Sequence, residues 1–193
     1  MQEIKVTVPD GKRAEWKEIN GEQALVLVDV KDNRPVTERI KTFEDAVKEL
    51  GEDNPLVSLY RSFESDLPEK DESDKDVLAF IKLRIVVAAL NEGWVPTFEK
   101  GEYRWFPWYY IYTKEEFDDM DEDDKRRVVG RAVNYAGPVG GCVYAGAYDV
   151  SSHSHSSNGA RLAFRDRERA EYAGRQFAEL YVRFYYDADF ENL

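Results

Sequence analysis

The chain has 193 residues, of which 39 are acidic and 27 basic, so its formal net charge is −12. This acidity argues against binding to a nucleic-acid backbone, which needs a basic footprint, and against anionic membrane surfaces. Hydrophobic residues make up 42% of the chain, enough for a folded core, and the single cysteine excludes an internal disulfide. Because no signal peptide and no apolar run of membrane-spanning length is visible, we expect a soluble protein.

Residues 1–35 are expected to form an antiparallel β-meander. Apolar and polar side chains alternate over residues 4–8, and the Pro-Asp-Gly sequence at 9–11 predicts a turn. Asn-Gly at 20–21 is the strongest two-residue hairpin signal. We therefore predict three strands within residues 3–30, followed by a polar linker.

Three helices are expected next. Thr42 lies three residues before Asp45, which is typical of a capping box, and Gly51 ends this first helix. Asn54, followed by proline, starts the second helix. The third, residues 76–91, is the most apolar helix of the chain, so we expect it to be the buried centre of the fold.

The second half of the chain mixes strands and helices. Residues 105–113, WFPWYYIYT, combine aromatic and β-forming side chains and predict a strand. Thr113 is expected to cap one short acidic helix, and Asp121 to start another that runs to about Gly130. Residues 166–186 predict one amphipathic helix. Further strands are expected at residues 133–135, 142–150 and 161–164.

The order of these elements is strands, helices, strands and a helix, without βαβ alternation, and it predicts an α+β fold. We expect antiparallel sheets packed against a buried central helix and a C-terminal amphipathic helix. Residues 1–35 form the meander and residues 36–193 the α+β core in this scheme, and the two are expected to make one compact unit.

The only cysteine and the only two histidines all lie within residues 138–164. His153 and His155 would face the same side of a strand and could reach one metal ion. Two ligands are an incomplete set, and the serine-rich flank favours an exposed loop, so we expect solvated histidines and no metal site. Cys142 lies far from both histidines on a Gly/Ala strand, which favours a buried small side chain over a thiol nucleophile.

Eight carboxylates lie within residues 115–124. The run lacks the glycine of an EF-hand, and acidic residues are favoured at helix N-termini, so two helix starts explain it. An enzyme that uses carboxylates such as Asp118 or Glu122 stays an alternative, because acid–base pairs come from positions distant in sequence. Five arginines between residues 161 and 175 alternate with acidic residues, which favours paired surface charges over a phosphate site.

Aromatic side chains supply the best candidate binding residues. Those between residues 103 and 112 could stack on a sugar or a base, although such dense aromatics usually supply a core. Two tyrosines that precede a Ser/Gly/Asn run have the composition of recognition loops. The candidate binding residues are Tyr103, Trp105, Trp108, Tyr110, Tyr112, Tyr144, Tyr148, His153 and His155.

Several linked stretches have a familiar pattern, among them VTERIKTFEDAVKELG, LRIVVAALNEGW, YRWFPWYYIYT and NGARLAFRDRERAEYAGRQFAELY. They resemble an uncharacterised protein group common in gut Bacteroidales genomes, their prophages and their phages. The resemblance covers nearly the whole chain and implies a phage or mobile-element origin. The group has no established activity, so the resemblance implies no catalytic residues.

We therefore expect a non-enzymatic phage or prophage protein without a cofactor, either a virion component or an accessory interaction module. Its partner would be another protein or, through self-assembly, a second copy in a homo-oligomer. A factor that sequesters a host nucleotide signal or a defence protein is the alternative, since acidic charge suits DNA mimicry. The expected location is the host bacterial cytoplasm, or the virion if the role is structural.

Overall fold

The computed structural model describes residues 5–30, 32–66, 75–97, 99–126, 128–130, 139–150 and 159–186. The chain divides into two compact units, Met1–Pro35 and Val36–Leu193. Within the described ranges, each unit has its own secondary structure, and the helices belong to the second unit.

The N-terminal unit is a β-hairpin. Strands β1 (Lys12–Ile19) and β2 (Glu22–Asp29) pair antiparallel, with Trp16 opposite Leu25. Asn20 and Gly21 have φ angles of 54° and 84°, so the predicted Asn-Gly turn is present.

The prediction of a strand before this hairpin, over residues 4–8, is wrong for the residues described. Residues 5–9 are not in a strand. The turn predicted at residues 9–11 does form, and the N–H of Lys12 donates to the carbonyl oxygen of Pro9 over 3.1 Å. Pro9 has no N–H to give to a strand ladder, which disfavours an extension of the sheet on this side.

The second unit consists of helices and one antiparallel sheet, with the strand order β3-β5-β4. Its strands are β3 (Arg104–Thr113), β4 (Val128–Gly130) and β5 (Val139–Val150). Its helices are α1 (Val36–Arg39), α2 (Phe43–Leu50), α3 (Pro55–Asp66), α4 (Lys75–Leu90), α5 (Lys114–Asp118), α6 (Glu122–Lys125), α7 (Arg167–Gln176) and α8 (Ala178–Tyr186).

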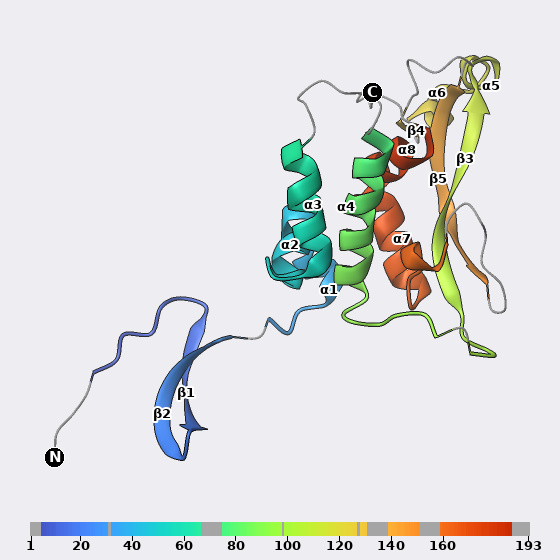
Figure 1. Ribbon diagram of the computed structural model, residues 1–193. Helices are drawn as coiled ribbons and strands as arrows, with labels where there is room; N and C mark the ends of the chain where they lie inside the picture. Colours follow the sequence, from blue (N-terminus) through green and yellow to red (C-terminus); the bar gives the residue numbers. More distant parts are fainter. Residues whose placement is uncertain are drawn as a thin grey trace. The chain divides into compact units, whose positions relative to one another are not determined.

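Helix α4 is the centre of this unit. Figure 1 shows α4 between the α2/α3 pair and the α7/α8 pair, with the sheet on the far side of α7 and α8. Because α4 is covered on opposite sides, it is apolar around most of its circumference, and Leu83, Ile85 and Leu90 are fully buried. The predicted α+β fold, with a buried central helix packed among helices and a sheet, is confirmed.

Local capping signals decide where several helices begin. The side chain of Thr42 accepts from the N–H of Asp45, whose carboxylate accepts from the N–H of Thr42 over 2.9 Å. A second capping box joins Thr113 to Glu116 at the start of α5. Both predicted capping boxes are therefore confirmed.

The C-terminal helix predicted for residues 166–186 is two helices instead of one. Phe177 separates α7 from α8, with φ −116° and ψ 28°. Its side chain is buried in the core, and its carbonyl oxygen still accepts from the N–H groups of Leu180 and Tyr181. The change of direction at Phe177 lets α7 and α8 each turn an apolar face to the core, which a sequence periodicity cannot reveal.

Two further predictions are wrong in their extent. The helix that begins at Asp121 ends at Lys125, and Val128–Gly130 joins the sheet, as β-branched valines favour. Residues 161–164 begin as a 3₁₀ turn at Ala160–Leu162 and meet β3 only at one bridge, between Trp105 and Phe164. The strand predicted at residues 133–135 lies outside the described residues.

Within the described part of the chain, none of the helices is long and apolar enough to cross a bilayer.

Candidate functional site

The aromatic strand β3 has two different faces. On the inner face, toward α7 and α8, Tyr109 is buried and donates a hydrogen bond from its hydroxyl to the carbonyl oxygen of Gly174. Its ring also lies 5.7 Å from that of Tyr181 on α8. The alternation of a strand turns Trp108 and Tyr110 to the opposite, outer face. The strand therefore supplies core on one side and surface on the other.

The outer face exposes a short row of aromatic rings. Trp108 and Tyr110 are 49% and 50% exposed. Their ring centroids lie 5.3 Å apart, and the ring of Tyr110 lies 6.3 Å from that of Tyr112. The planes are tilted by 46° and 48° at these two contacts, so the row is a corrugated surface and not one flat platform.

Both ends of this row are covered by other side chains. Phe106 is buried, and its ring stacks on that of Tyr148 from β5 at 5.6 Å, with Trp94 packed nearby. At the other end Tyr112 packs against a small cluster that contains Phe117. The exposed part of the outer face is thus centred on Trp108 and Tyr110, and these two residues with Tyr112 are named the aromatic row below.

The remaining candidate residues lie in different places. Tyr103 is 56% exposed just before β3, whereas Trp105 is partly buried and packs against the main core. Tyr144 is paired in register with Tyr109, but its side chain lies outside what the structure describes. His153 and His155 lie outside the described residues. The structure therefore brings Trp108, Tyr110 and Tyr112 together, and it removes Trp105 and Tyr148 from the exposed surface.

The acidic run forms two helix starts, as expected. Asp121 caps α6 by accepting from the N–H of Asp124 over 2.8 Å. Glu122 is exposed and pairs with Lys125 at 3.7 Å. No group of three or more His, Cys, Asp or Glu side chains placed to hold a metal ion occurs among the residues that the structure describes.

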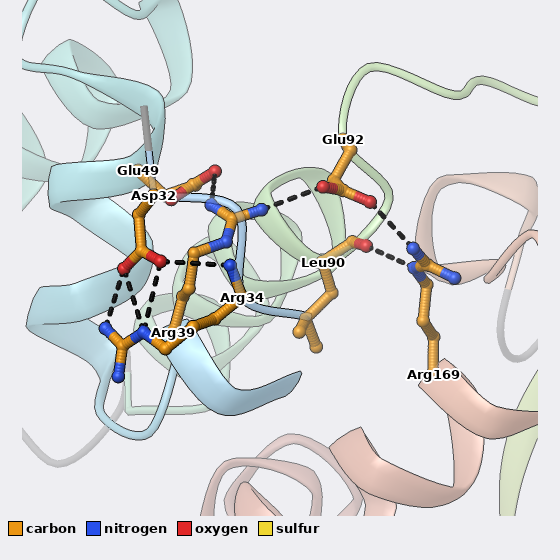
Figure 2. Close-up of polar contacts among 7 residues, drawn as sticks. All are labelled: Asp32, Arg34, Arg39, Glu49, Leu90, Glu92 and Arg169. Carbon is orange, nitrogen blue, oxygen red and sulfur yellow. Dashed lines mark hydrogen bonds and ion pairs between the residues drawn. The ribbon is translucent and has the colours of Figure 1, made fainter. Parts of the chain in front are cut away.

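A charged network ties the end of α4 to α1 and α7 (Figure 2). The carboxylate of Glu92 accepts from Arg39 at 2.8 Å and from Arg169 at 2.7 Å, and Arg169 also donates to the carbonyl oxygen of Leu90 at 2.7 Å. Arg39 has a second partner in Glu49. Separately, in the N-terminal unit, Arg34 pairs with Asp32. The Glu92 network holds helices together, since its guanidinium groups are already paired with carboxylates.

The arginines between residues 161 and 175 are mostly paired, as predicted, but one of them differs. Arg167 and Arg175 both pair with Glu171, and Arg165 lies 3.4 Å from Asp166. Arg161 makes no hydrogen bond or ion pair to the part of the chain that the structure describes. Sequence reasoning grouped Arg161 with the helix-surface pairs, because only the fold shows that it precedes α7 in a 3₁₀ turn.

No protein-family model, curated protein or solved structure matches this chain.

Proposed function

We propose that this protein is a non-enzymatic binding protein that contacts a basic protein partner through the aromatic row of β3. The observation behind this is the exposure of Trp108 and Tyr110 side by side on a sheet face whose two ends are covered. Tryptophan and tyrosine are the residues that contribute most to binding when a partner buries them. An exposed pair of this kind is costly to leave in water unless something covers it.

The geometry favours a protein over a sugar or a base as the occupant. Stacked ligands need ring faces in a common orientation, whereas the rings here are tilted by 46° and 48°. A corrugated row instead matches the uneven surface of a protein, where aromatic side chains are enriched at the buried core of interfaces. The net charge of −12 favours a partner with arginine and lysine, which also bind aromatic faces.

The resemblance of the sequence to phage and prophage proteins supports a virion component or an accessory interaction module as the setting of this contact. The alternative of a carboxylate enzyme has no comparable support. Asp118 and Glu122 line neither the cavity beside α4 nor the one between α2 and α8. Asp118 is the exposed last residue of α5, and Glu122 is the exposed first residue of α6.

The experiment is site-specific photocrosslinking in the producing cells. A benzoylphenylalanine at position 110 should crosslink to one protein, which is identified by mass spectrometry and then purified. Calorimetry with that protein should show binding that Trp108→Ser weakens at least about ten-fold, the size expected for a buried aromatic anchor. Affinity should also fall as salt is raised.

The control variant is Leu59→Ser, which removes a large apolar side chain that is 47% exposed on α3. It should leave the affinity unchanged. The proposal is overturned if Trp108→Ser and Leu59→Ser bind equally well, or if position 110 crosslinks only to other copies of this chain.

A further inference from the structure

A second feature is a cavity of about 920 Å³ beside α4, which shares no lining residue with the aromatic row. It is bounded by α4, by the turn that follows α4 and by the segment around the 3₁₀ turn. Its walls are mostly apolar, and they include Phe80 and Val87 from α4, Trp94 from the turn, and Phe184 from α8. The volume is in the range of cavities that hold small molecules.

Two cationic side chains interrupt this apolar lining, Arg84 on α4 and Arg161 in the 3₁₀ turn. Arg84 is half-buried and Arg161 is exposed. Neither makes a hydrogen bond or an ion pair to the described part of the chain. This differs from Arg39 and Arg169, whose guanidinium groups each have carboxylate partners.

The two arginines also repel each other. Burial lowers the pKa of Arg84, and the positive charge of Arg161 lowers this pKa further. Two neighbouring cations, one of them half-buried, are unfavourable unless an anion lies near both. In a chain with 39 acidic and 27 basic residues, carboxylates to neutralise them are plentiful in the sequence. Yet no carboxylate lines this cavity among the residues that the structure describes.

The uncharged polar side chains of the lining already have partners within the fold. Asn54 lines the cavity and accepts a hydrogen bond from the N–H of Leu56. Asn91 also lines the cavity, and its side chain bonds the carbonyl oxygen of Ala163 and the N–H of Arg165. The charged ligand-binding groups that the lining offers are therefore the two guanidinium groups, which suit carboxylate or phosphate oxygens.

We propose that this cavity binds a small amphipathic anion, whose carboxylate or phosphate pairs with Arg84 and Arg161 while its apolar or aromatic body packs against Phe80, Val87 and Trp94. This site is separate from the aromatic row and does not depend on a protein partner there.

The test uses two fluorescent probes that share a ring system. 8-Anilinonaphthalene-1-sulfonate has an anionic group, and N-phenyl-1-naphthylamine has none. The purified full chain should bind the anionic probe more tightly than the neutral one. Each of Arg84→Met and Arg161→Met should weaken binding of the anionic probe about ten-fold, as loss of a charge-assisted hydrogen bond implies. Binding of the neutral probe should change less than about two-fold, since the apolar walls are intact.

The matched control is Arg126→Met, which removes a guanidinium group that pairs with Asp123 on an exposed surface. It should change neither titration. Circular dichroism of each variant excludes unfolding as the cause of a loss. A second variant, Ala88→Phe, fills the cavity from α4 and should weaken the binding of both probes.

Competition distinguishes the two head groups. Dodecanoate, dodecyl phosphate and dodecanol are each titrated against the bound anionic probe. The proposal requires that at least one anion displaces the probe at lower concentration than the alcohol does, and the better anion identifies the preferred head group. Equal displacement by all three compounds would show an apolar cavity without anion recognition. An equal loss of affinity for both probes in Arg84→Met would show the same.

Discussion

The side-chain amide of Asn91 donates a hydrogen bond to the carbonyl oxygen of Ala163 over 2.8 Å, and its oxygen accepts from the N–H of Arg165 at 3.1 Å. Asn91 is only 3% exposed and follows the last residue of α4. The contact joins the end of the central helix to the segment that leads into α7, so it fixes one wall of the anion-binding cavity proposed above.

Asn91→Ala should destabilise the protein by about 2–3 kcal/mol, because it leaves the buried carbonyl oxygen of Ala163 and the partly buried N–H of Arg165 without their partner. Urea denaturation followed by tryptophan fluorescence measures this. Asn54→Ala removes a helix cap, the bond to the N–H of Leu56 at 2.9 Å, and should cost only about 1 kcal/mol. Equal losses in the two variants would contradict a special role for Asn91.

The stability of α2 should depend on pH through Asp45. Its carboxylate accepts from the N–H groups of Lys41 and Thr42, and these bonds lower its pKa from the ordinary value of 3.8. A carboxyl group with a lowered pKa in the folded state stabilises the fold above pH 3.8 and loses that contribution as the pH falls through the lowered pKa.

Asp45→Asn should therefore lower the free energy of unfolding by about 1 kcal/mol at pH 7. The difference from the wild-type free energy should shrink below pH 3.8. Thermal unfolding at a series of pH values measures it. A difference in the free energy of unfolding that does not shrink as the pH falls well below 3.8 would show that the capping bonds do not involve the ionised form.

The two faces of β3 should respond differently to substitution. Tyr109→Ala removes an inner-face side chain that is 8% exposed and donates to the carbonyl oxygen of Gly174, and it should cost about 3–5 kcal/mol. Tyr110→Ala, at a position that is 50% exposed, should cost less than about 1 kcal/mol. Urea denaturation of both variants tests this, and a large loss in Tyr110→Ala would place that ring in the core.

Glu92→Gln should weaken the link between Arg39 and Arg169 and cost about 1–2 kcal/mol, since one carboxylate serves two half-buried guanidinium groups. The cost should shrink in 1 M salt. Glu122→Gln is the control, because Glu122 pairs with Lys125 while 83% exposed, and it should cost less than about 0.5 kcal/mol. A cost for Glu92→Gln as small as the control's would mean that the network adds nothing to stability.

Arg84→Met should leave the free energy of unfolding unchanged within about 0.5 kcal/mol or raise it, because burial and the charge of Arg161 disfavour a cation at this position. Arg39→Met should lower it by about 1–3 kcal/mol through loss of its partners Glu49 and Glu92. Denaturation in the absence of any ligand compares the two. A marked loss in Arg84→Met would show that this arginine is paired within the fold.

The sequence by itself determined the features that depend on neighbours within a few residues. The capping boxes at Thr42 and Thr113, the Asn-Gly turn at residues 20–21 and the apolar central helix follow from hydrogen bonds and periodicity along one short segment. The α+β class followed from the order of those segments.

Only the tertiary structure decided which face of β3 is covered, where the C-terminal helix breaks, and that Arg84 and Arg161 line one cavity. Each of these depends on contacts between segments far apart in the chain. Packing against α7 and α8 buries Tyr109 and leaves Trp108 exposed, although the two are adjacent in sequence. Arg84 and Arg161 lie 77 positions apart in the sequence, and no local pattern predicts that they come close together. Their proximity is created by the fold.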